Sequence, residues 1–450
     1  MRRVPLRLTK VFAVILLLFT AMPALYAWTM HALITEPALR DLPAVRQAVT
    51  VRSLADFVNR HAAALETLLA VEEQWARQNL EFYRPRPDEL AFKAATPSAQ
   101  RVQAFMQAIR VHPGQPSLHQ DYLELLPSNP AAGRQRIDPL KLTVFKNLED
   151  LAKPVYVKLP TGSAVRALDV VSTASDEPDM GMDIGLFSDN GTEHGKRYGF
   201  GPQPFGNPNL EYGSQAPFHM GFYHEDGITF AAAGFLQHTY PEYRIHLYKT
   251  LASFAFANQE DYWGWRFTGW GLHYIGDLSQ PYHARALPGI SSGRMVCVSL
   301  LDIFGFSSFK DNAVQLVSNR HTVVDNLQNQ IMFAESQQNY PPDSIALQIV
   351  SADQKIIYSD KIPRTYITSL SFGRSDELDA LLEDTMPERL VSDPTFELSG
   401  SPEGQRLEAE ILKSQGPAAL KKLKRMLIMM LRSNTTANQA YVAAVLQGSR

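Results

Sequence analysis

Residues 271–283, which read GLHYIGDLSQPYH, decide how the rest of the chain is interpreted. His273 and Asp277 are four residues apart, so on a helix they lie on one face, where both side chains can bind one ion. Pro281 has no backbone N–H and disfavours helical backbone at the residue before it. We therefore expect the helix to end there and to bring His283 to another side of the same site, an arrangement that suits two metals better than one.

A second pair with the same spacing follows at His321 and Asp325. A single His–Asp pair of this kind is more often a hydrogen-bonded pair on a buried amphipathic helix than a metal site. The second pair lies on a predicted helix over 308–337, and His283 adds a third ligand-type residue to the first motif. Together these features favour the metal interpretation.

Composition and charge narrow the class of protein. The chain has 450 residues, of which 45% are hydrophobic and 20% charged, so it can form one large domain or about two to three ordinary ones and is not disordered throughout. A formal charge of −3 gives no general basic surface for nucleic acid. The single cysteine, Cys297, provides neither a disulfide framework nor a cysteine-based zinc site.

Residues 1–27 have the pattern of a secretory signal peptide. Four of the first ten residues are basic, the apolar run over 11–22 is too short to span a bilayer, and small residues follow at 24–27. We therefore expect a secreted or periplasmic protein, cleaved near Ala27. No later segment has 18 uninterrupted apolar residues, so no membrane-spanning segment is expected in the mature chain.

Cleavage at this point would make Trp28 the mature N-terminus. A free α-amino group and the first carbonyl oxygen can together bind a cation, and His31 stands three residues further on. The alternative interpretation is that Trp28 anchors a first helix beside a histidine on the helix face.

Hydrophobic spacing predicts a mainly helical chain, with breaks at prolines and glycines. The stretch over 345–358 also fits short strands. The predicted helical regions cover residues 31 to about 147, 249–280, 308–337, 405–415, 417–432 and 437–446.

Regular periodicity disappears between residues 159 and 218, where Gly, Pro, Asn and Asp are frequent. We expect a long ordered loop there, and such loops inside a domain are often functional. Asp176, Asp179 and Asp183 could each offer a carboxylate to a metal, although acidic clusters of this kind are otherwise solvated turns.

Residues 216–226, APFHMGFYHED, place two histidines and two acidic residues among aromatics. Alone, each histidine would be an ordinary polar residue. Because the stretch follows the acidic loop and precedes the helix of His273, His219 and His224 are candidate metal ligands.

Taken together, these motifs resemble the zinc-dependent phospholipase C and P1 nuclease family. The similarity runs from Trp28 to about Asp325 and assigns nothing from residue 340 onward. Its features, in the family's order, are Trp28 behind a signal peptide, HxxxD at 273–277, Gln280-Pro281, His283 and a second HxxxD at 321–325.

The resemblance implies an all-α fold with long irregular loops, in which three zinc ions lie in a cleft. Similarity to family segments favours Asp176 over Asp179 and Asp183, and His219 over His224. Carried over by motif, the first zinc would be bound by Asp176, His219, His273 and Asp277. The second would be bound by the amine and carbonyl of Trp28, by His31 and by a bridging Asp277. The third would be bound by His283, His321 and Asp325.

The resemblance also implies a domain organisation. After the signal peptide, a zinc-dependent phosphodiesterase domain would cover 28–339, with a helical insertion at about 40–147. Residues 340–450 would form a mostly helical C-terminal region of unknown role.

By this resemblance the chain would be a secreted phospholipase C that hydrolyses the glycerol–phosphate ester of phospholipids, such as phosphatidylcholine, at a membrane or micelle surface. The attacking water would lie between the zinc ions that share Asp277, or Asp176 would be its general base. Tyr274, Gly276 and the 280–284 run look closer to the phospholipase branch than to the nucleases, and no stable nucleic-acid partner is expected.

Two other functions remain open. A P1-type single-strand nuclease or 3'-nucleotidase would present stacking aromatics within a positive groove, and the aromatics of this chain alone do not separate the two enzymes. An exported binding protein would use the same residues to hold helices together around one zinc, without turnover.

Overall fold

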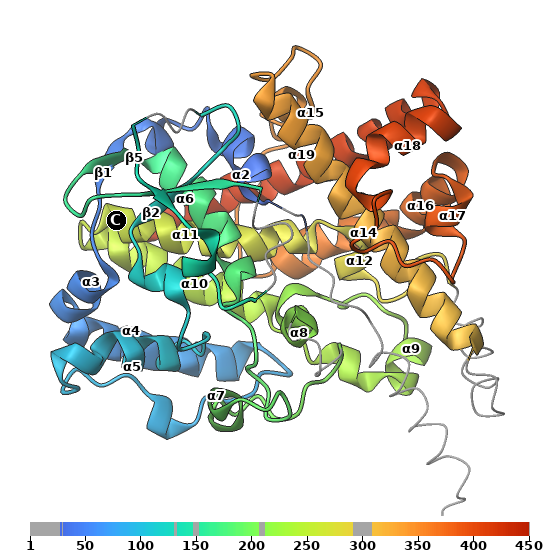
Figure 1. Ribbon diagram of the computed structural model, residues 1–450. Coiled ribbons are helices and arrows are strands. Elements are labelled where there is room, and N and C mark those ends of the chain that lie inside the picture. The colour runs from blue at the N-terminus through green and yellow to red at the C-terminus, as the bar shows by residue number, and fades with distance from the viewer. Residues whose placement is uncertain are drawn as a thin grey trace, which may run out of the picture.

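Helix α11 (Asp261–Leu278) lies at the centre of the structure and carries the first HxxxD motif (Figure 1). Every residue of α11 after the first is buried, because the helix packs against α6 (Ala167–Asp176), α10 (Pro241–Ala257) and α19 (Pro417–Gly448). A helix that is buried on all sides belongs to the core of a large domain. The motif therefore lies deep in the protein.

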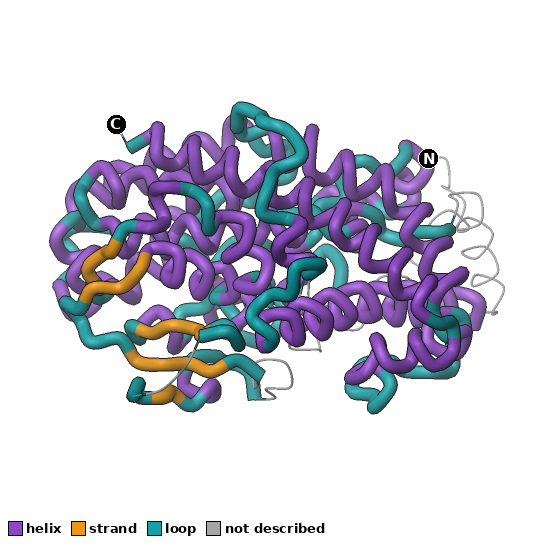
Figure 2. Tube along the Cα trace, turned by 90° about the horizontal axis from the view of Figure 1, so that it is seen from above, coloured by secondary structure: helices purple, strands orange, loops and turns teal. Residues whose placement is uncertain are grey.

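The computed structural model describes residues 28, 30–129, 133–146, 153–206, 212–290 and 308–449. The predicted signal peptide and Cys297 lie outside these ranges. The described chain is mainly helical, as predicted (Figure 2). Its other helices are α2 (Ala32–Leu39), α3 (Leu54–Arg60), α4 (Ala62–Asn79), α5 (Arg101–Ala108), α7 (Glu193–Arg197), α8 (Ala216–His219), α9 (Gly227–Ala232), α12 (Pro281–Ala284), α14 (Ser308–Gln337), α15 (Ile345–Gln348), the π-helical η10 (Pro363–Thr368), α16 (Ser369–Thr385), α17 (Glu388–Val391) and α18 (Leu407–Ser414).

Two small antiparallel sheets interrupt the region between 31 and 147, where only helices were predicted. Strand β1 (Ala48–Thr50) pairs with β5 (Ala164–Arg166), with Val49 opposite Val165. In the second sheet, β4 (Val155–Lys158) lies between β2 (Tyr122–Leu125) and β3 (Arg136–Ile137). These strands are only two to four residues long, and periodicity does not separate so short an apolar run from a piece of helix.

The expectation of an irregular loop from 159 to 218 is wrong for its first part. Helix α6 occupies residues 167–176, and only Asp169 among them is not buried. Because α6 is covered by α2, α11 and β2, its polar residues Ser172, Thr173 and Ser175 are buried along with its apolar ones. Serine, threonine and aspartate have low helix propensity, so a ten-residue segment rich in them does not stand out as a helix. Asp176 is the last residue of this helix.

The C-terminal third follows the predicted helices closely. Helix α14 spans the predicted 308–337, and α19 runs unbroken over the two helices predicted between 417 and 446. Short strands were expected between 345 and 358, but the structure has α15 at 345–348 and describes no strand from 340 to 449. None of the described helices is both long and apolar enough to cross a membrane.

Helix α19 contributes to both large hydrophobic cores. Tyr441 packs in the core around α10 and α11, and Leu427 packs in the core that contains Trp28. Helix α19 also contacts α2, near the start of the described chain. The Gln439 side chain donates a hydrogen bond of 2.9 Å to the carbonyl oxygen of Ala38 on α2. The C-terminal region thus packs directly against elements that carry candidate ligands. The predicted division near residue 340 stays a prediction.

Candidate metal centre

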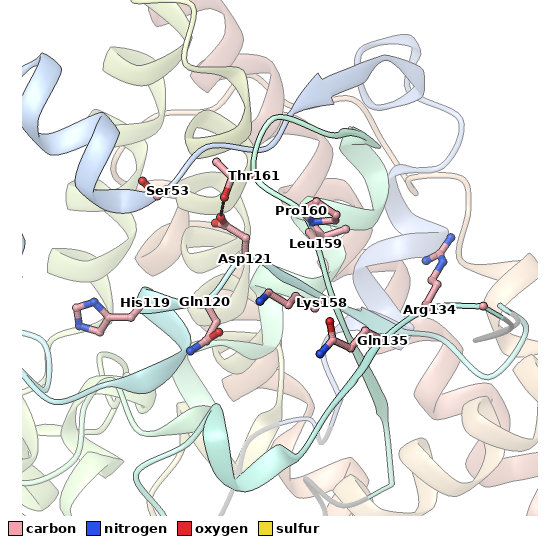
Figure 3. Close-up of a pocket in the computed structure, with 11 residues that line it drawn as sticks. Ser53, His119, Gln120, Asp121, Arg134, Gln135, Lys158, Leu159, Pro160 and Thr161 are labelled. Atoms are coloured by element: carbon pink, nitrogen blue, oxygen red, sulfur yellow. Dashed lines mark hydrogen bonds between the residues drawn. The ribbon is translucent and has the colours of Figure 1, made fainter.

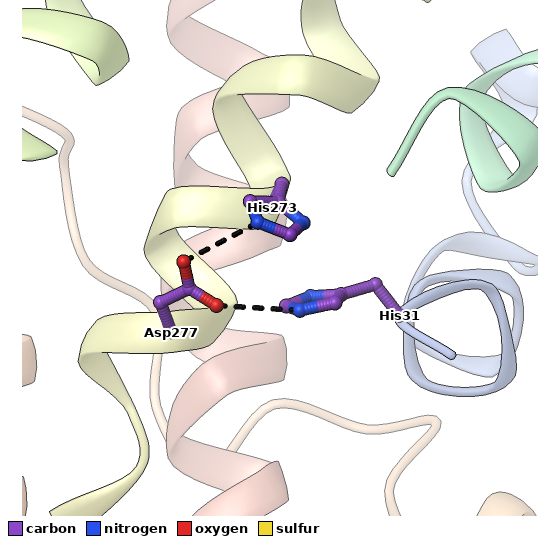
Figure 4. Close-up of side chains that lie close together, drawn as sticks. All are labelled: His31, His273 and Asp277. Atoms are coloured by element: carbon purple, nitrogen blue, oxygen red, sulfur yellow. Dashed lines mark ion pairs between the residues drawn. The ribbon is translucent and has the colours of Figure 1, made fainter. Parts of the chain in front are cut away.

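Helix α11 and the start of α2 bring three candidate ligands together (Figure 4). His31 Nε2 lies 3.3 Å from Asp277 Oδ1, and His273 Nε2 lies 3.3 Å from Asp277 Oδ2. The three side chains are at most 2% exposed, and their ligand atoms all lie within 4.8 Å of one another. Gly276 makes room for His31, because a Cβ at that position would lie 2.7 Å from His31 Nδ1.

A second group shares His273 with the first. It adds His219, the last residue of α8, and Asp179, which lies in a 3₁₀ turn directly after α6. His219 Nδ1 lies 2.8 Å from Asp277 Oδ2 and 4.0 Å from Asp179 Oδ1, and His273 Nε2 lies 3.7 Å from the same Asp179 oxygen. The two groups therefore form one continuous buried cluster of imidazoles and carboxylates.

A third cluster lies where the chain turns after α11. As predicted, the helix ends before Pro281, and α12 starts there with Gln280 as its N-cap. His283 Nε2 faces His321 Nε2 of α14 at 3.0 Å, and His321 Nε2 lies 3.1 Å from Asp325 Oδ2. The Gln280 side chain also donates a hydrogen bond of 3.0 Å to Asp325, which links the helix break to the second HxxxD motif.

Backbone carbonyl oxygens fix the tautomer of two histidines. His273 Nδ1 lies 2.8 Å from the carbonyl oxygen of Ser175, and His283 Nδ1 lies 2.8 Å from that of His219. A carbonyl only accepts, so Nδ1 carries the proton in both rings and each Nε2 presents a lone pair to its cluster. This is the usual outer contact of a metal-binding histidine.

Burial keeps these two rings neutral. It lowers the pKa of His273 well below the ordinary value, and together with the neighbouring His321 it lowers the pKa of His283 to about 3. For Asp277 burial acts in the opposite direction, but His273 and His219 outweigh it and hold the pKa of the carboxyl well below its usual range. Neutral imidazoles and an ionised carboxylate are the forms that bind metals.

His219 has three acidic neighbours, Asp277, Asp183 and Asp179. Burial lowers its pKa, but Asp277 and Asp183 outweigh burial and raise it to about 10. Burial also raises the pKa of Asp179 to about 7. An excess of buried negative charge of this kind is balanced either by protons or by a cation.

The donor set fits a cation. The Nε2 lone pair of His273 faces an Asp277 oxygen that can only accept, and the Nε2 lone pair of His283 faces a second imidazole nitrogen. In addition, His31 Nε2 and Asp277 Oδ1 face each other at 3.3 Å, and both are buried without a well-formed hydrogen bond. Poorly satisfied buried polar atoms are costly, and a cation in each cluster would satisfy the acceptor atoms of that cluster.

Three residues of the acidic and histidine-rich stretches lie outside the two groups. Asp176 Oδ2 accepts a hydrogen bond of 2.9 Å from the backbone N–H of Ala32, and burial raises its pKa to about 6. Asp183 is paired with Arg244 and Tyr274. His224 contacts the carbonyl oxygen of Arg364 instead. The geometry thus favours Asp179 and His219, and Asp176 as a ligand stays a prediction.

Trp28 is fully buried, and its indole Nε1 donates a hydrogen bond of 2.9 Å to Ser279 Oγ at the end of α11. This contact holds the segment before His31 against the helix that carries Asp277. Metal binding by the amine and carbonyl of Trp28 stays a prediction.

Glu124 on β2 is a buried acid that the sequence did not single out. It is 6% exposed, and its carboxyl group lies beside that of Asp176. Burial and the neighbouring Asp176 raise its pKa well above the ordinary value. No spacing rule connects a strand residue at 124 with the end of a helix at 176, so only the fold brings the two acids together.

A separate cleft of about 780 Å³ opens beside β2 and β4 (Figure 3). It is lined by polar residues, among them Lys158 and Arg134, and by Asp121, which accepts a hydrogen bond of 2.9 Å from Thr161 Oγ1. None of the candidate metal ligands lines this cleft.

The buried clusters bring His31, His219, His273 and Asp277 together with Asp179, and His283 together with His321 and Asp325. No protein-family model, no curated protein and no solved structure matches the chain.

Proposed function

We propose that the protein is a zinc-dependent phosphodiester hydrolase, a phospholipase C with the all-α fold of the phospholipase C and P1 nuclease family. The observation that carries the proposal is the convergence of motifs that are far apart in the sequence. His31, His219 and Asp277 come from three different helical elements and meet within a few ångströms, with their contacting atoms buried. A single structural zinc that only holds helices together would not require so many imidazoles around one carboxylate.

Three ions are proposed, in line with the family resemblance. Asp179, His219, His273 and Asp277 would hold one, His31, Asp277 and the terminus at Trp28 a second, and His283, His321 and Asp325 a third. Zinc suits this set because it prefers imidazole nitrogen and carboxylate oxygen. When bound, zinc would supply the positive charge that neutralises phosphate oxygens and lowers the pKa of a water to near neutrality.

The residues of the chain have distinct tasks in this proposal. Asp277 lies between His31 on one side and His219 and His273 on the other, so its two oxygens can serve two ions. Asp176 is the proposed general base, because its carboxylate is held by the backbone N–H of Ala32, directly after the ligand His31, and belongs to neither ligand group.

Asparagine variants separate the two acids at the end of α6. Asp179→Asn should lose one zinc, because its oxygen lies in the group with His219 and His273. Asp176→Asn should keep the zinc content of the wild type and lower kcat by about 10²–10⁴-fold, the usual contribution of a general base. Metal analysis and kinetics on both variants test this assignment, and loss of zinc from the Asp176 variant instead would make that residue the ligand.

Phospholipid is the proposed substrate, and export through the predicted signal peptide is proposed with it. The support is the motif similarity to the phospholipase branch and the net charge of −3, which gives no basic footprint for a nucleic acid. The product would be a diacylglycerol and a phosphorylated head group.

The test uses purified chain that starts at Trp28. We expect about three zinc ions per chain by elemental analysis, release of a phosphorylated head group from phosphatidylcholine micelles, and loss of both after treatment with a chelator. Single-stranded DNA serves as the parallel substrate, and its cleavage without lipid hydrolysis would favour the nuclease. One tightly held zinc, without hydrolysis of either substrate, would favour the alternative function of an exported zinc-binding protein without catalytic activity.

A further inference from the structure

We infer that Asp183 is a positioning residue for His219: fixed by Arg244 and Tyr274, it accepts the Nε2 proton and so directs Nδ1 of His219 at the metal. The inference rests on the proposed zinc centre. It assigns to Asp183 a role that is different from the ligand role considered for it from the sequence.

His219 presents its two nitrogens to two different surroundings. Nδ1 faces the cluster, 2.8 Å from Asp277 Oδ2 and 3.1 Å from His273 Nε2. Nε2 faces away from these atoms and lies 3.4 Å from Asp183 Oδ2. His273 Nε2 carries a free lone pair and faces His219 Nδ1. A metal that binds both rings must therefore bind Nδ1 of His219. The proton of a neutral His219 ring then has to be on Nε2, on the side of Asp183.

Asp183 is held too firmly to turn toward a metal itself. Its Oδ1 lies 2.5 Å from Arg244 Nη2, and its Oδ2 accepts a hydrogen bond of 2.6 Å from the Tyr274 hydroxyl. Both Asp183 and Arg244 are 0% exposed. Arg244 is fixed in turn by hydrogen bonds to the backbone carbonyl oxygens of Ile109 and Arg110. The carboxylate is thus neutralised and anchored before a metal arrives.

At 3.4 Å, the contact from His219 Nε2 to Asp183 Oδ2 is longer than an ordinary hydrogen bond. This nitrogen is buried and makes no hydrogen bond to any described residue. Asp183 is therefore the acceptor that the ring can reach with a small rotation. Outer carboxylates of this kind fix the tautomer and raise the basicity of a metal-binding histidine, and their loss typically weakens metal affinity about 10–100-fold.

Tyr274→Phe is the milder test, because it removes one hydroxyl that holds Asp183 and leaves the ion pair with Arg244 intact. Asp183→Asn is the stronger test, because the amide oxygen is a weaker acceptor and carries no charge. We expect the affinity for one zinc to fall about tenfold in Tyr274→Phe and up to about 100-fold in Asp183→Asn, measured by competition with a chelator.

Tyr441→Phe is the matched control. Tyr441 is buried in the same hydrophobic core, and its hydroxyl donates a hydrogen bond of 3.1 Å to the carbonyl oxygen of Ile245 instead of to Asp183. The same chemical change at this ring should leave zinc affinity as in the wild type. Asp183→Asn leaves Arg244 without its partner and could prevent folding. In that case the two tyrosine variants still test the inference, because zinc affinity should fall in Tyr274→Phe and not in the control.

A spectroscopic measurement tests the tautomer directly. In zinc-loaded protein labelled with ¹⁵N-histidine, His219 should show a protonated Nε2 and a metal-bound Nδ1, with faster exchange of the Nε2 proton in Tyr274→Phe. A proton on Nδ1, or unchanged zinc affinity in folded Asp183→Asn, would overturn the inference. Neither measurement depends on turnover, so a wild type that binds zinc but hydrolyses no phosphodiester would refute the proposed function without deciding the role of Asp183.

Discussion

Replacing Asp277 by Asn should abolish phosphodiester hydrolysis and lower the zinc content from about three ions per chain to about one. Asp277 is fully buried between His31, His219 and His273, and two proposed zinc ions share its charge. The amide is uncharged and has a single acceptor oxygen, so it cannot serve both ions. We expect kcat/KM to fall at least about a hundredfold, the scale on which removal of one electrostatic group slows catalysis.

Asp261→Asn is the control on the same helix. Asp261 is the first residue of α11 and is not buried, so its substitution should leave zinc content and turnover near those of the wild type. Zinc analysis and phosphatidylcholine hydrolysis on both variants make the comparison. Wild-type turnover by the Asp277 variant would rule out its bridging role. If the variant lost only the zinc at His283 and His321, a residue other than Asp277 would be the carboxylate that the two other ions share.

Arg266→Met should lower the free energy of unfolding by about 3–5 kcal/mol, the cost of leaving a buried charge without its partner. Arg266 on α11 is buried and pairs with Glu177, which is 1% exposed. Glu177 also accepts a hydrogen bond of 2.5 Å from Trp270 Nε1. This network holds the end of α6 against α11, and the carbonyl oxygen of Ser175 beside it fixes the ring of His273. Urea unfolding followed by circular dichroism measures the loss.

An exposed ion pair provides the comparison for Arg266. Arg60 is 55% exposed and lies 3.7 Å from Glu260, which keeps His61 and Arg52 as partners. Arg60→Met should therefore cost less than about 1 kcal/mol. An equally small effect at Arg266 would mean that the buried ion pair contributes little net stability.

The sequence predicted the parts of the centre that depend on local spacing. HxxxD at 273–277 and at 321–325 each place two side chains on one helix face, and a proline after the first motif ends the helix. His283 and His321 meet as this reasoning expects. The mainly helical character of the chain followed from the same periodicity.

The parts that were missed depend on contacts between distant segments. Helix α6 is short and rich in serine, threonine and aspartate, which have low helix propensity, and only its packing against other elements shows that these residues are buried. The spacing of Asp176, Asp179 and Asp183 does not say which carboxylate turns toward α11, because that choice depends on where α6 ends and how the following turn packs. Glu124 reaches Asp176 only through the pairing of β2 with β4 and its packing on α6.

The hydrogen bond from Gln439 to Ala38 joins positions 401 residues apart. The segment with His31 is therefore stabilised by a helix that lies very far from it in the sequence, and contacts of such high sequence separation form slowly. Assembly of the centre would thus be a late event in folding, because α2 reaches its final position only once α19 has packed against it.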